Sequence, residues 1–307
     1  MRVKCPVNQK GNWLNRGNSK YVDVIPNFNL PALRTRKDAP EPGGVEFLRR
    51  KREGLPVEKY WSKKFPLGFQ VCKNAGVCAV GCYALCGRYR GWPQTWKAHV
   101  SLDFTLHPGF VETISEEIHE EWENNRMVRI HTSGEFYSLP YFKKWVEIAR
   151  NCPDHEFWVY TKMVRMVKSV RDLPHNLNII FSEGGREDRF IDRDRDRYSR
   201  VFPRFTAPES LPVYGFVDCT EDDSIPICKD KIQKVGLIFH GQGRAFTTAM
   251  ENPPTNTVFL PAYDQQGKKL PDPPMAYEQE IAVFKLRRGR NVGHALWYTN
   301  RPADEVL

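Results

Sequence analysis

The sequence predicts an α/β fold in which parallel strands form a partial (β/α) barrel, flanked by irregular N- and C-terminal extensions. Helical and strand-like apolar segments alternate between residues 111 and 181, and this order favours right-handed strand–helix–strand units around a parallel sheet. Each expected strand also ends in polar residues, as strands beside a ligand site do. With 307 residues, the chain is long enough to bury one large core.

Composition divides the chain into three expected parts. Residues 1–66 form an N-terminal segment whose stretch 35–66, rich in proline, glycine and charge, is interpreted as a basic surface insertion. Residues 67–245 hold the barrel-like α/β core and a cluster of cysteines. Residues 246–307 are proline-rich, and we expect them to pack on the core as an irregular extension.

The predicted core elements follow one another in the order that βαβ units require. Val111–Trp122 places apolar residues at helical spacing, with most of its glutamates on the opposite face. Residues 186–204 alternate acidic and basic side chains, which indicates a solvated helix or loop. The other expected elements are strands at 127–130, 157–160 and 177–181, helices at 141–150 and 164–170, and apolar runs at 213–217 and 235–239.

Polar side chains directly follow the three expected strands. In parallel sheets the ligand site lies beyond the carboxyl ends of the strands, so these side chains are candidate site residues by position. We assign candidate catalytic roles to His131, Lys162 and Glu183, because imidazole, ammonium and carboxylate groups bind or transfer protons and anions. Ser182, at the end of the third strand, is expected to contact a cofactor.

Four of the eight cysteines lie within fifteen residues, at positions 72, 78, 82 and 86. The N-terminus lacks the apolar core of a secretion signal, which predicts a cytoplasmic protein with reduced thiols. Thiolates bind soft metals, and three of them can hold a [4Fe–4S] cluster with one iron open. Structural zinc usually uses paired C-x-x-C knuckles, which this segment lacks. Zinc and a packing-only role remain the alternatives to iron–sulfur.

A small-small-acid turn, Ser133-Gly134-Glu135, follows the first strand after the cysteines. Such a turn lets the backbone approach a ligand, and its carboxylate can accept hydrogen bonds from an ammonium group. The order of cysteine loop, helix, strand and Gly-Glu turn resembles the radical S-adenosylmethionine (SAM) enzymes. The resemblance implies that Glu135 holds the SAM amino group, that Ser133, Gly134 and Tyr83 belong to the cofactor site, and that an external donor supplies electrons. It implies metal ligation by Cys72, Cys78 and Cys82, with Cys78, Cys82 and Cys86 as the alternative set.

Residues 17–240 resemble the phage "gene product 88" family more closely. The motifs that carry this resemblance are GNSK (17–20), IPNFNLPAL (25–33), Cys72-x5-Cys78-x3-Cys82-Tyr83-Ala84, RIHTSGEFYS (129–138), YFKKWVEIA (141–149), WVYTK (158–162) and FSEGGREDRFI (181–191). The family name implies a bacteriophage origin, and hence the host cytoplasm, but no reaction. Members tend to carry a cysteine-rich run before the final strand. Here Cys219 and Cys228 stand in that region, and together with His240 they could form a partial zinc site, with Cys5 as a further candidate ligand.

The formal net charge is +9, which is compatible with a nucleic acid as partner. The first hypothesis is a radical SAM-like [4Fe–4S] enzyme acting on nucleic acid or a modified nucleotide. One alternative is a zinc-stabilised nucleic-acid-binding protein whose basic segments, Arg49–Arg52 and Lys285–Arg290, contact phosphates. Another is a zinc-dependent hydrolase or base-modifying enzyme with Glu135 as general base. No apolar run is long enough to span a bilayer, so we expect no membrane partner.

Overall fold

The computed structural model divides the chain into two compact units. Unit 1 comprises Met1–Lys73 and Gly87–Ile180, and unit 2 comprises Asn74–Cys86 and Phe181–Leu307. The residues that the structure describes are 2–8, 10–16, 25–35, 64–66, 68–76, 78, 82–85, 89, 92–202, 208–222, 224, 233–238, 280–288 and 291–299.

A seven-stranded parallel sheet with order β1-β2-β3-β4-β5-β7-β6 is the central feature of the described residues. Every register given for its neighbouring strands is parallel. The predicted α/β class with parallel strands is therefore confirmed. The strands are β1 (Asn27–Phe28), β2 (Met127–Ile130), β3 (Glu156–Thr161), β4 (Leu177–Ser182), β5 (Tyr198–Phe202), β6 (Val217–Asp218) and β7 (Lys234–Ile238).

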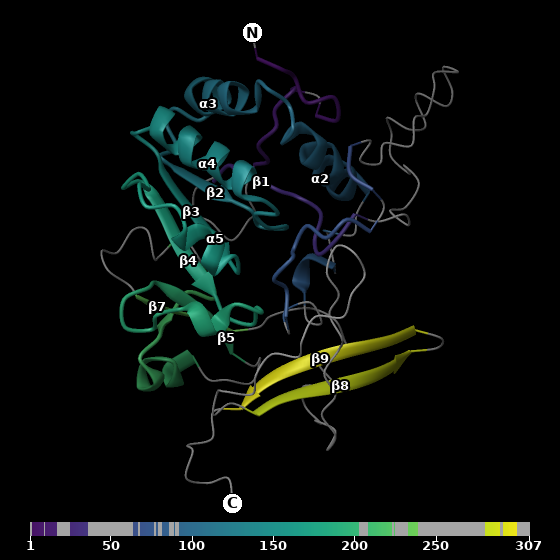
Figure 1. The fold of residues 1–307 in the computed structure, drawn as a ribbon, viewed down its shortest axis with the longest axis vertical. Coiled ribbons are helices and arrows are strands. Elements are labelled where there is room, and N and C mark those ends of the chain that lie inside the picture. Colours follow the sequence, from purple (N-terminus) through teal and green to yellow (C-terminus); the bar gives the residue numbers. More distant parts are fainter. Residues whose placement is uncertain are drawn as a thin grey trace, which may run out of the picture. The chain divides into compact units, whose positions relative to one another are not determined.

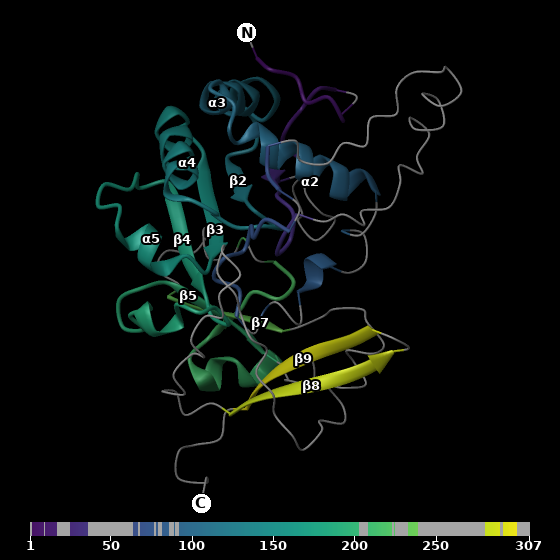
Figure 2. The same ribbon diagram turned by 45° about the vertical axis from the view of Figure 1, so that its right-hand side comes forward.

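In unit 1 the strands enter the sheet in chain order, and helices form the connections. Two helices, α2 (Trp92–Phe104) and α3 (Phe110–Glu121), precede β2; α4 (Leu139–Asn151) links β2 to β3, and α5 (Val164–Lys168) links β3 to β4. Right-handed crossovers that always move in one direction place their helices on one face of a sheet. Figures 1 and 2 show α4 and α5 on the same side of β2, β3 and β4.

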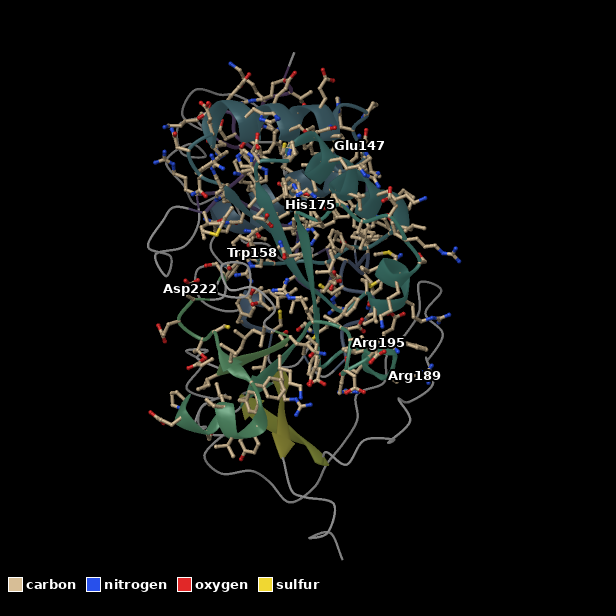
Figure 3. All side chains as sticks on the ribbon, turned by 90° about the vertical axis from the view of Figure 1, so that its left-hand side faces the viewer. Glu147, Trp158, His175, Arg189, Arg195 and Asp222 are labelled. Atoms are coloured by element: carbon tan, nitrogen blue, oxygen red, sulfur yellow. The ribbon has the colours of Figure 1, made fainter. Side chains whose placement is uncertain are left out.

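Aromatic rings join α3 and α4 to the sheet. Phe28 of β1 lies 5.5 Å from Phe110 of α3 and 5.6 Å from Trp145 of α4, measured between ring centroids, and all three side chains are fully buried. The apolar stripes predicted for the two helices therefore face the core. On the outer surface of α4, Glu147 is exposed, whereas Trp158 lies buried in β3 (Figure 3). Each such aromatic side chain contributes about 1.5–3 kcal/mol to folding through burial.

Three segments differ from their prediction. Residues 92–104 form α2, which the apolar pattern did not indicate because its buried face includes polar residues such as Lys97 and Ser101. Residues 186–204, expected to be a solvated helix or loop, also contain strand β5. Arg189 and Arg195 project from that segment into solvent (Figure 3), but Tyr198 and Phe202 are buried.

The third difference is an antiparallel hairpin near the C-terminus. Strands β8 (Glu280–Arg288) and β9 (Asn291–Thr299) pair over their whole length in a region expected to be irregular. Most of the basic segment Lys285–Arg290 therefore belongs to a strand, and residues 289 and 290 fall outside the described part. No helix among the described residues is long and apolar enough to cross a bilayer.

Candidate functional site at the carboxyl ends of the strands

The turn after β2 leaves extended geometry at two positions. His131 has a φ of 62° and Gly134 a φ of 92°, both in the left-handed region. Left-handed backbone costs a non-glycine residue about 1–2 kcal/mol, so surrounding contacts must hold the turn. Leu30, just beyond β1, supplies two of them: its amide donates to the Ser133 carbonyl at 2.9 Å, and its carbonyl accepts from the Ser133 hydroxyl at 2.9 Å.

Asn29 supplies the side-chain contact to the same turn. Its Oδ1 accepts from the Thr132 amide (2.9 Å), the Thr132 hydroxyl (2.6 Å) and the Ser133 amide (3.2 Å). Its Nδ2 donates to the Asn27 side chain at 2.9 Å, which fixes the orientation of the amide. Sequence analysis missed Asn29, although an asparagine directly after a strand is a recognised signal for side chain-to-backbone bonding.

Gly134 is required by packing as well as by its φ. A Cβ at this position would lie 2.5 Å from the Leu30 Cβ and 3.0 Å from the Leu30 Cα. Sequence analysis attributed this glycine to close approach of a ligand. In the structure the atoms next to it belong to the segment that follows β1.

Glu135 ties the turn to β3. Its Oε1 accepts from the Phe136 amide and the Thr161 hydroxyl, and its Oε2 accepts from the Lys162 amide, each at 2.8 Å. Burial raises the pKa of Glu135 above its ordinary value, and these three hydrogen bonds oppose the shift. A carboxylate offers about four lone-pair directions, so one remains for a further donor.

His131 points toward α4. Its Nε2 lies 2.8 Å from the Tyr141 hydroxyl, and its ring packs on Phe136 at 4.9 Å between centroids. Burial lowers the pKa of His131 to about 3, so the ring is neutral at physiological pH. Its Nδ1 is buried, and no described residue forms a hydrogen bond with it. These features favour a structural role over the predicted catalytic one.

Lys162 and Ser182 lie at the ends of their strands as predicted. Lys162 directly follows β3, and its backbone is bound by Glu135, while its side chain is half-buried. Ser182 is the last residue of β4 and is half-buried too. Neither position excludes the assigned contact with a ligand.

Cys72 is paired with Leu33 within unit 1. The Leu33 carbonyl accepts from the Cys72 amide at 3.1 Å, and the Leu33 amide donates to the Cys72 sulfur at 3.3 Å. Leu33 has a φ of 60°, a conformation that is a genuine outlier for a bulky residue. Backbone N–H groups aimed at sulfur stabilise thiolate ligands and tune metal–sulfur centres.

Cys78 is docked on the turn that follows β4 within unit 2. Its amide donates to the Gly184 carbonyl at 3.2 Å, and Ala75 forms a β-bridge with Gly185. Gly76 permits this approach, since a Cβ there would lie 2.9 Å from the Gly184 oxygen. Arg186 adds a side-chain bond to the Ala75 carbonyl at 3.1 Å.

Glu183 is clamped by two arginines. Arg193 donates to Oε1 at 2.8 and 3.1 Å, and Arg200 donates to both carboxylate oxygens. The Glu183 side chain is 3% exposed, so the charges are largely shielded from water. Phe216 covers the Arg200 guanidinium at 5.2 Å. The predicted catalytic role of Glu183 therefore competes with a tight structural role that the sequence did not reveal.

The remaining predicted ligands are only partly described. Cys82 is half-buried, and Tyr83, which begins a short 3-10 helix (η2, Tyr83–Leu85), is 47% exposed. Cys219 is a buried thiol whose amide donates to the Gly236 carbonyl at 2.9 Å. Cys5 is also buried, and burial raises its pKa. Predicted residues outside the described part are Cys86, Cys228, His240 and Arg49–Arg52.

Among the described residues, no three histidine, cysteine, aspartate or glutamate side chains converge into a preformed metal site. The fold and the carboxyl-end turns define an α/β protein in which Cys72 is held beyond β1 in unit 1 and Cys78 beyond β4 in unit 2. The chain belongs to the gene product 88 family, whose match covers residues 37–251. The predicted family resemblance is thereby confirmed, and it is consistent with a bacteriophage protein. Comparisons with curated proteins and with solved structures found no match.

Proposed function

We propose that the chain is a radical SAM-like enzyme with a [4Fe–4S] cluster on Cys72, Cys78 and Cys82. The observation that carries the proposal is where each unit anchors its part of the cysteine segment. In unit 1, Cys72 is bonded to Leu33 beyond the end of β1, and in unit 2, Cys78 is bonded to Gly184 beyond the end of β4. Within each unit the anchor lies beyond the carboxyl end of a strand, which is where parallel sheets place their ligands.

The donor set fits an iron–sulfur cluster chemically. Cys72, Cys78 and Cys82 carry reduced, half-buried thiols, which are soft ligands within reach of solvent for cluster loading. The amide that donates to the Cys72 sulfur is a contact typical of cluster thiolates. The chain order of strands β1 to β4 and the position of α4 and α5 on one face of the sheet (Figures 1 and 2) support a partial barrel, the finer fold we propose.

A bound cluster would supply one-electron chemistry for the reductive cleavage of SAM into methionine and a carbon-centred radical that abstracts hydrogen from a substrate, with the electron coming from an external donor. The chain's own part is binding and exclusion of water. Glu135 would accept a hydrogen bond from the SAM ammonium with its remaining lone pair, and Tyr83 and Ser182 would contact the cofactor. Lys162 would bind an anionic group of the substrate.

The net charge of +9 favours nucleic acid or a modified nucleotide as the substrate class. A polyanionic substrate would make binding fall steeply as salt rises. A salt titration with a short single-stranded DNA therefore tests this part of the proposal separately from the chemistry.

The test of SAM binding uses anaerobically reconstituted protein and the electron paramagnetic resonance spectrum of its reduced cluster. We expect SAM to shift the spectrum of the wild type and of the control Glu147→Gln, whose side chain is exposed on α4. Glu135→Gln should weaken the response at least tenfold in SAM concentration, because an amide replaces a charged acceptor. A wild-type spectrum that SAM leaves unchanged would overturn the proposal.

A further inference from the structure

The turn that carries Glu135 is held from two sides within unit 1. On the β3 side, the Glu135 carboxylate itself binds the Thr161 hydroxyl and the Lys162 amide. On the β1 side, the contacts come from Asn29 and Leu30. Leu30 holds the turn through its backbone atoms and through its short approach to Gly134. Asn29 holds the turn through its side chain, so a substitution at Asn29 can remove that contact by changing the side chain alone.

The strain in the turn explains why it needs this support. His131 remains in register with β1, since its amide donates to the Phe28 carbonyl at 2.9 Å, yet its φ is already left-handed. The two residues that follow it, Thr132 and Ser133, give three donor groups to the single oxygen of Asn29. A strained backbone persists when neighbouring groups over-determine it.

The Asn29 amide is itself oriented. Its Nδ2 donates to Asn27, the buried first residue of β1, so its oxygen can face only the turn. This arrangement is that of a preorganised acceptor, whose geometry is set by the sheet before any ligand arrives.

We infer that Asn29 is a positioning residue for Glu135: its side chain fixes the turn after β2, so that the Glu135 carboxylate is held against β3 with one lone pair left for a ligand donor. The inference rests on the proposed function for the identity of that donor, the ammonium group of SAM. In this inference Asn29 acts by holding the turn and does not itself contact the ligand.

The test compares Asn29→Leu with Asn29→Asp in the full chain. Leucine is similar in size but removes the acceptor, whereas aspartate keeps an acceptor oxygen for the turn and loses only the amide donor to Asn27. Asn151→Leu, at the exposed end of α4, is the matched control. Amide hydrogen exchange is read at Thr132 and Ser133, and also at Phe136 and Lys162, whose amides donate to Glu135.

We expect Asn29→Leu to accelerate exchange about tenfold at all four amides, and Asn29→Asp and Asn151→Leu to stay within about threefold of the wild type. A purely local role would change Thr132 and Ser133 and leave Lys162 untouched, which would overturn the inference. In reconstituted protein, Asn29→Leu should also weaken SAM binding about tenfold while iron content stays constant. Equal SAM affinity in Asn29→Leu and wild type would overturn it as well. A wild type that binds no SAM defeats the proposed function, and the exchange data then still decide whether Asn29 positions Glu135.

Discussion

Replacing Gly134 with alanine is expected to destabilise unit 1 by two separate effects. The new Cβ would lie 2.5 Å from the Leu30 Cβ and 3.0 Å from the Leu30 Cα, distances that side chains do not adopt. The backbone φ of 92° is also unfavourable for any residue with a Cβ. Both effects act in the folded state at the turn that carries Glu135.

The magnitude follows from adding the two effects. A left-handed backbone costs alanine about 1–2 kcal/mol, and overpacking against a fixed neighbour costs about 1–3 kcal/mol. Gly134→Ala should therefore lower the free energy of unfolding by about 2–5 kcal/mol. Gly68→Ala is the matched control, because Gly68 has a φ of 82° but a Cβ added there would have no atom of the described residues within 4 Å.

The assay is urea unfolding of both variants and the wild type, followed by circular dichroism. The loss of chain entropy in the unfolded state is the same for both substitutions, so it cancels in the comparison. The difference between the variants isolates the contact with Leu30, and we expect it to be about 1–3 kcal/mol. Equal stability of Gly134→Ala and Gly68→Ala would refute the packing argument.

Three further predictions concern buried polar groups and the cysteine segment. The folded-state pKa of His131, about 3, lies below its unfolded value of 6.5, so stability should fall by up to about 1.4 kcal/mol per unit as pH drops from 6.5 toward 3. Asparagine tolerates a positive φ, so His131→Asn should fold and should lose this dependence of the unfolding free energy on pH, measured by urea titrations between pH 7 and 4. An unchanged pH dependence would contradict its assignment to His131. Glu183→Gln should lower the free energy of unfolding by about 3 kcal/mol, because two guanidinium groups lose their shared anion. The control Asp172→Asn, in an exposed ion pair, should lower it by less than about 1 kcal/mol. Similar losses in the two variants would show that the ion pairs of Glu183 contribute little to stability. Gly76→Ala should release the Cys78 segment from Gly184, which limited proteolysis would detect as faster cleavage, and unchanged cleavage would count against this docking.

The parallel core could be predicted because its pattern is strong and local. Strands β2, β3 and β4 are short apolar runs separated by amphipathic segments, and their short length and their alternation with those segments identify them as strands. Helix α2 escaped detection because burial there includes Lys97, whose ammonium donates to the Leu14 carbonyl at 3.2 Å. Periodicity cannot identify a buried face whose polar groups find partners far away in sequence.

Glu117 shows the same limit at a single residue. Its helix places it among glutamates expected to be solvated, yet it is fully buried and accepts from the Trp13 and Leu14 amides at 2.7 and 2.8 Å. These partners lie more than a hundred residues away, so no local pattern indicates them. Burial raises the pKa of Glu117, which the two amide hydrogen bonds oppose.

The strand-end positions of the candidate site residues could be predicted from the sequence, but their side-chain contacts could not. Strand-end position correctly placed Glu135 beside Lys162, because the parallel strands β2 and β3 end on the same edge. His131 has a left-handed φ and its ring bonds to Tyr141 of α4, and nothing in the local sequence indicates that conformation. The partners of Glu183 come from a loop and from β5, a strand that the alternating charges concealed.

The central claim is that the cysteine segment carries an iron–sulfur cluster, and metal and sulfide analysis of anaerobically purified protein tests it most directly. The account predicts about four irons and four sulfides per chain, loss of both in Cys78→Ser, and retention of both in Cys219→Ser, whose thiol is buried and is not one of the proposed ligands. One zinc per chain with no sulfide and no visible absorption, in the wild type and in Cys219→Ser alike, would contradict it.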